Sequence, residues 1–354
     1  MVKIGRAPGF MRLLVIGAVL FLVGGCGQPS VSAAQGADTD PLTLRLGYLP
    51  NLTQGPALVG IAKGFFANAL GSEVRIEAHP FNAGPDAVTA ILSGSIDATF
   101  IGPNPTTNAY VQSHGEAVRV VSGTTSGGAL LVVRPGIDSV TKLRGMKIAD
   151  PQLGGSQDIA LRWFLKTKGF TSDAAGGGAV SVVPQDNSLV LNAFRQGQID
   201  GAWVPEPWAS RLVIEGGARV LVDERDLWPH GRFVTTNLVV NTSFLRLHPQ
   251  RTKALLEGLY QSIQFLNASP AAAQEAANDA LGMVTGKKLG TGVVASAWPH
   301  LTFTVDPLAA TLKVSAAHAH SLGLLAAVNL DGLYDLTLLN EVLAKHGAPP
   351  VAAQ

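Results

Sequence analysis

The chain has 354 residues, and its 26 Lys and Arg residues nearly balance 25 Asp and Glu residues, so the formal net charge is +1 at pH 7. This balance excludes a protein that binds nucleic acid or acidic polymers through its overall charge. After the N-terminal segment, no stretch offers the roughly 20 uninterrupted apolar residues of a membrane helix, so none is predicted there.

Residues 1–26 have the pattern of a secretion signal. Lys3, Arg6 and Arg12 form a positive start, and residues 13–23 are an apolar core too short to span a bilayer. Small residues then precede Cys26, the single cysteine of the chain. This order resembles the bacterial lipobox, in which the cysteine is lipidated and becomes residue one of the mature protein. The alternative is an ordinary signal peptide with a chance cysteine, but a lone thiol can form no intramolecular disulfide.

The next segment, residues 27–41, has Val31 as its one large apolar residue. It cannot bury enough surface to fold, so a flexible tether is predicted. A lipid on Cys26 would hold the protein at a membrane surface outside the cytoplasm, in the periplasm or on the outer face of the membrane. The folded part that follows would stay in water.

The rest of the chain repeats a pattern. The run Ala90-Ile-Leu-Ser-Gly-Ser-Ile-Asp-Ala-Thr-Phe returns as Ala193-Phe-Arg-Gln-Gly-Gln-Ile-Asp-Gly-Ala-Trp. Short apolar strands alternating with helical stretches are predicted around both copies, so the order βαβαβ occurs twice. The strands are predicted at 44–48, 74–79 and 97–101, and at 146–150, 180–184 and 200–204.

This repeat predicts an α/β protein with two lobes, each a mostly parallel sheet flanked by helices. Open α/β sheets bind ligands beyond the carboxyl ends of their strands, so the ligand is expected between the lobes. The alternative is one larger α/β domain made by duplication, without a cleft.

Several motifs carry a family resemblance. They are Leu46-Gly-Tyr, Asn82-Ala-Gly-Pro-Asp, Ser93-Gly-Ser-Ile-Asp-Ala, Leu143-Arg-Gly-Met-Lys-Ile-Ala, Ala193-Phe-Arg-Gln-Gly-Gln-Ile-Asp and Leu333-Tyr-Asp. In this order, and with the lipobox, the chain resembles the sulfonate/nitrate/taurine family of substrate-binding proteins of ATP-binding-cassette (ABC) transporters.

The resemblance implies the periplasmic-binding-protein fold of type II, with a ligand cleft between its lobes. Lobe I would comprise residues 42–130 plus 236–345, lobe II residues 131–235, and residues 346–354 a C-terminal tail. Crossovers near residues 124–135 and 233–240 would form the hinge.

The first candidate ligand contacts follow the first strand of each repeat. Each set begins a helix, whose unpaired N–H groups and partial positive charge suit an anion. Alternatively, Thr53 and Ser156 only cap their own helices. The two sets are Asn51, Thr53 and Gln54, and Gly155, Ser156 and Gln157.

Further candidates follow the later strands. Asn82, Ala83 and Gly84 come after the second strand of the first repeat, opposite Gln185, Asp186 and Asn187 of the second. Gly84 either admits a ligand close to the backbone or is a plain turn glycine. Gly102, Pro103, Asn104, Pro105 and Thr106 follow the third strand of lobe I, and Pro205 begins the matching run in lobe II. At the hinge, residues 124–126 (with Thr125 and Ser126) and 235–237 (with Thr235) could add hydroxyl and amide contacts or serve only as strand-edge and turn residues.

Glu206 and Trp208 follow the third strand of lobe II. The prolines around Asn104 and around Glu206 restrict the backbone, which favours a preorganised site over a plain loop. In the alternative, the prolines only end strands and Trp208 packs against the core of lobe II. A carboxylate in the cleft would repel a bare anion. Sulfonate binders of this family commonly have Gly-Ser-Ser-x-His where this chain has Gly-Ser-Gln-Asp-Ile at residue 155, so a zwitterionic or neutral solute is preferred.

These observations predict a membrane-tethered lipoprotein that captures a small polar or zwitterionic molecule by closure of two lobes. The molecule would be of the sulfonate, nitrate or taurine type or a heterocyclic precursor, passed to an ABC permease and its ATPase. The protein is expected to be a monomer without cofactor, metal or nucleic-acid partner. A tethered sensor for the same ligand is the alternative.

Enzymatic activity is not expected, because no Gly-x-Ser-x-Gly, Gly-x-Gly-x-x-Gly or His-Glu-x-x-His motif occurs. His318 and His320 lie two apart in a helical stretch and would face different ways. Trp163 and Trp203 are predicted to lie in the core.

Overall fold

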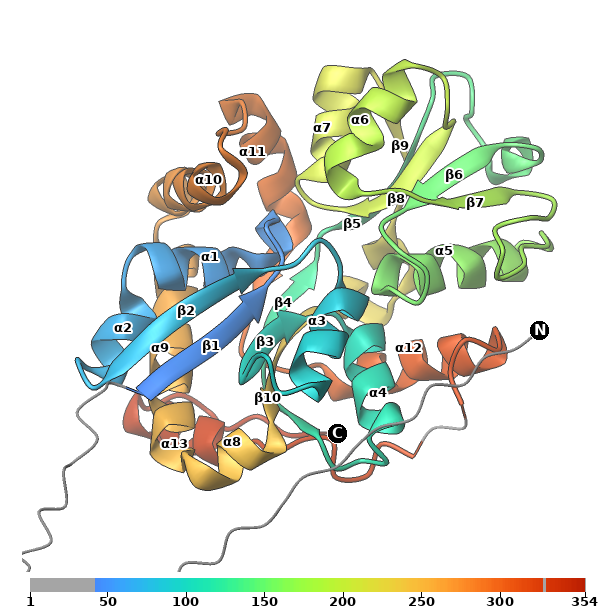
Figure 1. Ribbon diagram of the computed structural model, residues 1–354. Coiled ribbons are helices and arrows are strands. Elements are labelled where there is room, and N and C mark those ends of the chain that lie inside the picture. Colours follow the sequence, from blue (N-terminus) through green and yellow to red (C-terminus); the bar gives the residue numbers. More distant parts are fainter. Residues whose placement is uncertain (1–41, 327–328, 354) are drawn as a thin grey trace, which may run out of the picture. The chain divides into compact units, whose positions relative to one another are not determined.

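The computed structural model describes residues 42–326 and 329–353 (Figure 1). The predicted signal peptide, Cys26 and the predicted tether therefore lie outside the described residues. Within these residues, helices alternate with the strands of two separate sheets.

One sheet has six strands in the order β11-β4-β10-β3-β1-β2, and the other has five in the order β7-β6-β8-β5-β9. The strands are β1 (Leu42–Tyr48), β2 (Val74–Pro80), β3 (Ala98–Ile101), β4 (Val118–Gly127), β5 (Ala129–Val133), β6 (Lys147–Asp150), β7 (Ser181–Pro184), β8 (Gly201–Pro205), β9 (Arg219–Asp223), β10 (Val234–Asn241) and β11 (Leu301–Phe303). Below, lobe I means the part built on the six-stranded sheet and lobe II the part built on the five-stranded sheet.

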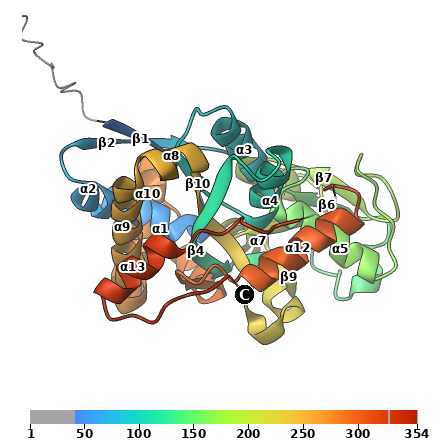
Figure 2. The same ribbon diagram turned by 90° about the horizontal axis from the view of Figure 1, so that it is seen from below.

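Helices pack on both sheets (Figures 1 and 2). The α-helices are α1 (Gly55–Ala62), α2 (Phe65–Leu70), α3 (Gly84–Leu92), α4 (Pro103–Gln112), α5 (Ser156–Thr167), α6 (Asn187–Arg195), α7 (Trp208–Gly216), α8 (Thr242–Leu247), α9 (Pro249–Ala268), α10 (Pro270–Thr285), α11 (Thr291–Ala297), α12 (Ala309–Ser321) and α13 (Thr337–Lys345). The short 3-10 helices are η1 (Leu52–Gln54), η2 (Val140–Leu143), η3 (Glu224–Leu227), η4 (Pro229–Gly231) and η5 (Trp298–His300).

The sequence repeat appears as a repeated topology. β1 lies between β2 and β3 and pairs parallel with both, and β6 lies between β7 and β8 in the same way. The predicted two-lobed α/β fold is therefore confirmed. The sheets are mixed rather than mostly parallel, because β10, β4 and β11 in one sheet and β5 and β9 in the other pair antiparallel.

The repeated Gly-x-Ile-Asp motif has a structural role in both lobes. Gly94 and Gly197 follow a helix with φ of 72° and 75°, a conformation that glycine adopts without a steric penalty. Asp97 then accepts a hydrogen bond from the backbone N–H of Arg45 at 2.8 Å, and Asp200 accepts one from Lys147 at 2.9 Å. The motif thus ties the third strand of each repeat to the first.

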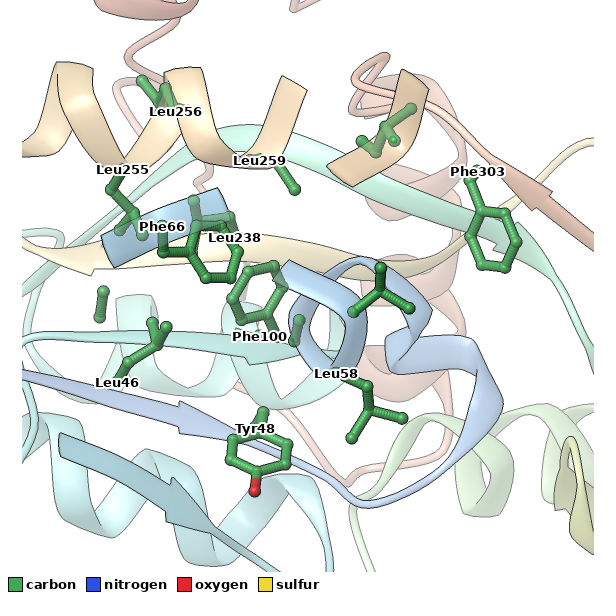
Figure 3. Packing of buried hydrophobic residues seen from close by; sticks show 14 of the residues in the cluster. Leu46, Tyr48, Leu58, Phe66, Phe100, Leu238, Leu255, Leu256, Leu259 and Phe303 are labelled. Carbon is green, nitrogen blue, oxygen red and sulfur yellow. The ribbon is translucent and has the colours of Figure 1, made fainter. Parts of the chain in front are cut away.

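One of the two main apolar clusters of lobe I lies between its sheet and α9 (Figure 3), and the other includes residues of α3 and α4. Phe66 of α2 and Phe100 of β3 are fully buried, with ring centroids 6.1 Å apart, and Leu255 and Leu259 of α9 pack in the same cluster. Burying each such side chain contributes about 1.5–3 kcal/mol. This core fixes β1 and β3, from whose ends the loops of the candidate site begin.

Lobe II has an apolar cluster on each face of its sheet. Trp203 is fully buried beside Phe164, which confirms the predicted core position of Trp203. Trp163 is only half-buried, so its predicted core position is wrong. It lies on the face of α5 that meets α12, a helix too distant in sequence for this contact to be predicted.

Two crossovers join the sheets. The first is the step from β4 to β5 through Gly127 and Gly128, both with positive φ (76° and 77°). A Cβ atom at Gly127 would lie 2.4 Å from the carbonyl oxygen of His300, so glycine is required there. The second crossover runs through η3 and η4, a few residues before the predicted one, because β10 already belongs to the six-stranded sheet.

Helix α12 lies alongside both α4 of lobe I and α5 of lobe II in the two views (Figures 1 and 2). Ile159 of α5 packs with Ala316 and Ala319 of α12, and Lys166 Nζ donates to the carbonyl oxygen of Ser321 at 2.8 Å. These contacts join the two lobes on this side of the molecule. Over the described ranges, no helix has the length and apolar character needed to cross a membrane.

Candidate functional site

A cavity of about 40 Å³ lies between the loops at the strand ends of the two lobes. Its lining comes from loops after β1, β2 and β3 in lobe I, loops after β6, β7 and β8 in lobe II, and the start of β10. The lining residues are Leu49, Asn51, Thr53, Gln54, Asn82, Ala83, Gly84, Gly102, Pro105, Pro151, Gly155, Ser156, Gln157, Asn187, Pro205 and Thr235. This is the place at which open α/β sheets hold ligands.

The starts of several helices meet at this cavity. Ala83, Gly102 and Gly155 are the residues that precede α3, α4 and α5, and Asn187 is the first residue of α6. At these four starts the residue before the helix makes no side-chain cap. In α4, Pro103 and Pro105 have no N–H and the N–H of Asn104 is bonded to Ser156 Oγ, so the free N–H donors come from α3 of lobe I and from α5 and α6 of lobe II. All four starts place a partial positive charge beside the cavity.

The predicted alternative, in which Thr53 and Ser156 only cap their helices, does not hold. Thr53 lies inside η1, and its Oγ1 donates to Asn51 Oδ1 at 2.6 Å. Ser156 is the first residue of α5 and makes no side-chain cap there. Its Oγ instead accepts from the backbone N–H of Asn104 at 3.5 Å, so this serine of lobe II meets the start of α4 in lobe I.

Two amide side chains of the lining have an unpaired oxygen. Gln54 Nε2 donates to Thr236 Oγ1 at 3.4 Å, whereas Gln54 Oε1 is buried without a partner among the described residues. Asn187 Oδ1 is also buried without a hydrogen-bond partner among the described residues. An unpaired buried acceptor costs about 1–3 kcal/mol, which a ligand N–H donor would recover.

The cavity lining contains no Asp, Glu, Lys, Arg or His side chain among the described residues. Its electrostatic character therefore comes from backbone dipoles and neutral amides and hydroxyls. In the same part of the chain, no group of three or more His, Cys, Asp or Glu side chains is arranged to hold a metal ion.

Two glycines are required by close packing at the cavity. A Cβ atom at Gly84 would lie 2.3 Å from Pro105 Cγ, and one at Gly102 would lie 2.4 Å from Ser156 Oγ. Gly84 thus packs α3 against the start of α4, and Gly102 lets lobe II approach lobe I.

Other predicted contact residues lie outside the cavity lining. Asn104 is buried with both of its side-chain polar atoms bound to Ser315 of α12, at 2.7 and 3.2 Å. Thr125 is buried in β4, and Ser126 Oγ accepts from the backbone N–H of Phe233 at 3.2 Å. Pro103 lines a neighbouring cavity of only about 10 Å³.

Glu206 also lies behind the cavity rather than in its lining. Its carboxylate accepts hydrogen bonds from the backbone N–H and the hydroxyl of Ser210 at 3.1 and 2.9 Å. Burial raises the pKa of the Glu206 carboxyl above its ordinary value, although the bonds from Ser210 lower it. The backbone carbonyl of Glu206 accepts from the N–H of Leu52 at 3.0 Å, which joins the lobes at the cavity's edge.

Trp208 lines a larger adjoining cavity of about 350 Å³. Asn51, Asn82 and Asn187 line both cavities, and Phe81 is a second aromatic residue of the larger one. Trp208 is half-buried and also packs against the apolar cluster of α6 and α7.

Most other lining residues belong to the loops and strand ends that the sequence indicated. Asn187 lies in the loop opposite Asn82, Ala83 and Gly84, and Thr235 is one of the hinge residues. Gly102, Pro105 and Pro205 belong to the sets after the third strands. Leu49 and Pro151 line the cavity without a prediction, because no polar side chain or helix start marks them in the sequence.

The fold and this interlobe cavity define the class of two-lobed periplasmic-binding proteins. A family model described as NMT1-like matches residues 37–280. The chain belongs to the NMT1-like family, and the resemblance predicted from its motifs is confirmed.

Relatives with known names are binding proteins. A Brucella abortus protein named as a binding protein is 27% identical over 68% of this chain and 71% of its own length. The taurine-binding periplasmic protein of Escherichia coli is 27% identical over 61% of this chain and 64% of its own.

Solved structures share the fold at low identity. The alkanesulfonate-binding protein SsuA of Xanthomonas axonopodis, bound to MOPS, gives a TM-score of 0.69 at 22% identity over 84% of this chain and 99% of its own. The desulfurization enzyme DSZB gives a TM-score of 0.62 at 20% identity, and the match covers 86% of this chain and 99% of the enzyme. The fold therefore hosts both binding proteins and an enzyme, and function has to be argued from the site.

Proposed function

We propose that this protein is the extracytoplasmic solute-binding lipoprotein of an ABC importer and that it captures a small zwitterionic molecule by closure of its lobes. The observation that carries the proposal is the interlobe cavity, which is lined by neutral polar side chains and uncapped helix starts from both lobes. A ligand held there would contact both lobes, so it would favour the closed arrangement.

The lining supports an oxyanion as one end of the ligand. Uncapped starts of α3, α5 and α6 offer N–H donors from two lobes, and no carboxylate of the described residues faces the cavity to repel an anion. About 10–15 Å³ holds one water, so a 40 Å³ cavity suits a compact headgroup such as a sulfonate or carboxylate.

The unpaired amide oxygens support an amine as the other end. Gln54 Oε1 and Asn187 Oδ1 would accept hydrogen bonds from an ammonium group. Glu206 cannot supply the negative partner that the sequence suggested, because its carboxylate is bound by Ser210 behind the lining. An amino sulfonate such as taurine combines both ends, in line with the taurine-binding relative.

Membrane attachment is a separate part of the proposal. It depends on the lipobox pattern at Cys26, and residues 1–41 lie outside the described residues. Mass spectrometry of the protein extracted from membranes should find acyl chains on Cys26. Replacing the residue, Cys26→Ser, should release the protein from the membrane fraction.

The first experiment is a thermal-unfolding screen of the full chain against taurine, other organosulfonates, nitrate, bicarbonate, aminophosphonates, pyrimidines and small aromatic acids. A ligand that binds the folded state at about 100 times its Kd stabilises it by about 2.7 kcal/mol, which such a screen resolves. We expect taurine or another amino sulfonate to give the largest shift, and a screen in which no solute stabilises the folded chain would contradict the proposal.

Matched variants locate the ligand. Asn187→Ala removes an unpaired amide of the lining. It should lower the affinity for the solute found in the screen by about tenfold, since a hydrogen bond to a charged group contributes about 1.5–3 kcal/mol. Asn192→Ala makes the same change at an exposed position of α6 and should leave the affinity unchanged. Equal effects from both variants would place the ligand elsewhere.

Deletion of the protein from its host separates transport from sensing. An importer component is required for accumulation of the labelled solute inside the cell, whereas a sensor is not. Unchanged accumulation after deletion would favour the sensor.

A further inference from the structure

A second pocket, of about 430 Å³, lies on the side of the molecule where α12 meets α5. One wall is a face of α5, the second is a face of α12, and the third is formed by η3 and η4 of the crossover. The lining residues are Ala160, Trp163, Phe164, Thr167, Lys168, Glu224, Leu227, Trp228, Pro229, Ala310, Thr311, Val314 and His318. Elements of both lobes therefore enclose it.

Aromatic rings dominate this pocket. His318 stacks on Trp163 across the lobes, with ring centroids 4.1 Å apart and planes at 13°. Trp228 stacks on Phe233 at 5.6 Å and lies 6.0 Å from His318. Leu227 and Val314 are exposed by 46% and 44%, which is unusual for large apolar side chains that face one cavity. These walls suit a flat aromatic ligand.

Glu224 is the acidic group of the pocket. It is 6% exposed, and its carboxylate accepts from Trp203 Nε1 at 2.8 Å and Trp228 Nε1 at 3.4 Å. A carboxylate has about four acceptor sites, so two remain open. Among the described residues, no cationic side chain pairs with it, and burial raises the pKa of its carboxyl to about 7. Burying an acid without a cation is unfavourable, which a cationic ligand group would relieve.

We propose that this pocket is a second ligand site, which binds a planar aromatic molecule whose amine or amidine group pairs with Glu224. The aromatic part would lie among Trp163, Trp228 and His318. Lys168 is the other charged residue of the lining, but it is exposed, so its repulsion of a cation is screened by water and salt.

The second site is separate from the interlobe cavity. Glu224 and Trp228 also line a small cavity of about 10 Å³, which shares Ser156, Gln157 and Thr235 with the interlobe cavity. Space for about one water cannot pass an aromatic ring. The two sites are therefore neighbours along α5, and a ligand in the second site does not depend on the proposed solute in the first.

The test is calorimetric titration of the full chain with 2-aminobenzimidazole, a planar ring system with an amidine-like end. We expect one molecule to bind per chain. The analogue 2-methylbenzimidazole lacks the exocyclic amine and should bind about tenfold more weakly. Glu224→Gln should lower the affinity for 2-aminobenzimidazole by a similar factor.

Three further variants keep the proposal falsifiable if Glu224→Gln does not fold. Ala310→Trp fills the pocket from an exposed position of α12 and should abolish binding. Ala317→Trp makes the same change at an exposed position of α12 outside the pocket, and Asn82→Ala changes only the interlobe region. Both should bind 2-aminobenzimidazole like the unmodified chain.

Three results would overturn the second site. The unmodified chain could fail to bind 2-aminobenzimidazole at millimolar concentration, or Ala310→Trp could bind as well as the unmodified chain. A loss of affinity in Asn82→Ala as large as that in Ala310→Trp would place the compound in the interlobe cavity.

Discussion

The two lobes share the order of their three parallel strands but differ in the charge they bury. Tyr48 ends β1 of lobe I, whereas Asp150 ends the corresponding strand of lobe II and is fully buried. Likewise, the residue between two prolines after the last repeated strand is the neutral Asn104 in lobe I and the acidic Glu206 in lobe II. The repeat therefore fixes where strands and helices lie, while the polar content of each interior varies independently.

Lobe II pairs one of its buried acids with a cation, whereas the carboxylate of Asp150 has no hydrogen-bond partner among the described residues. Asp158 and Arg162 of α5 form an ion pair at 2.5 Å, with exposed fractions of 0% and 2%. Burial and the nearby carboxylate of Asp158 raise the pKa of Asp150, which favours its neutral form. Lobe I has an ion pair nearer the solvent, Arg45 with Asp97, in which Arg45 is 37% exposed.

The largest expected effect comes from breaking these two ion pairs. Arg162→Met leaves Asp158 buried without its cation and should lower the free energy of unfolding by about 3–5 kcal/mol. Arg45→Met should cost about 1 kcal/mol or less, because water screens a partly exposed pair. Urea unfolding of the full chain measures both, and similar losses in the two variants would refute the contrast between the lobes.

The second effect is a dependence of stability on pH that originates in lobe II. The folded state retains a proton on Glu224 between its ordinary pKa of about 4.5 and the raised value of about 7, so stability falls as pH rises through this window. The shift corresponds to about 3 kcal/mol at most. Burial also raises the pKa values of Asp150 and Glu206, so both carboxyls contribute to the slope in the same direction.

Unfolding in urea at a series of pH values between 5 and 8 measures this slope. Glu224→Gln should reduce the slope without abolishing it, because Asp150 and Glu206 still contribute, whereas Glu341→Gln, at an exposed position of α13 in lobe I, should leave it unchanged. If the dependence of the unfolding free energy on pH were unchanged in Glu224→Gln, the Glu224 carboxyl would not be a source of this dependence.

The third effect concerns the approach of the lobes. Gly102→Ala would place a Cβ atom 2.4 Å from Ser156 Oγ, so the lobes could not come as close, and affinity for the cleft ligand should fall by about tenfold. Adding Ser156→Gly removes the opposing hydroxyl and should restore part of the affinity. Calorimetry with the solute found in the screen measures both, and no loss in Gly102→Ala would show that the ligand does not need this close contact.

The smallest effect is expected at the edge of the lobe contact. Lys166→Met removes the bond to the Ser321 carbonyl but leaves the apolar packing of Ile159 on α12 intact. Because Lys166 is exposed, the free energy of unfolding should change by less than about 0.5 kcal/mol. A larger loss in urea unfolding would indicate that this bond holds the lobes together.

Much of the fold was predictable because it depends on local signals. All six predicted strands have counterparts whose ends agree within two residues, since apolar runs and the Gly-x-Ile-Asp motif mark them directly. The part of the lining that follows β1 and β6 was predictable for the same reason, because a loop between a strand and a helix start has a known place in such sheets.

The rest depends on contacts between distant segments. Asn104 is bound by Ser315, 211 residues later, and the face of α5 that carries Trp163 is covered by α12. The proline pattern around Glu206 indicated a fixed side-chain direction, but not that Ser210 would bind the carboxylate away from the cavity. Sequence spacing contains no information on which partner a buried polar group finds.

The chain segments at which both crossovers meet the six-stranded sheet are bonded to each other. Thr235 Oγ1 donates to the carbonyl oxygen of Gly127 at 2.5 Å, and the N–H of Phe233 donates to Ser126 Oγ at 3.2 Å. Because the two segments are bonded to each other, we expect them to move together in the proposed closure. Two fluorescent labels, one on each lobe, would then report solute concentration through one distance, which makes the fold suitable for a reagentless optical sensor.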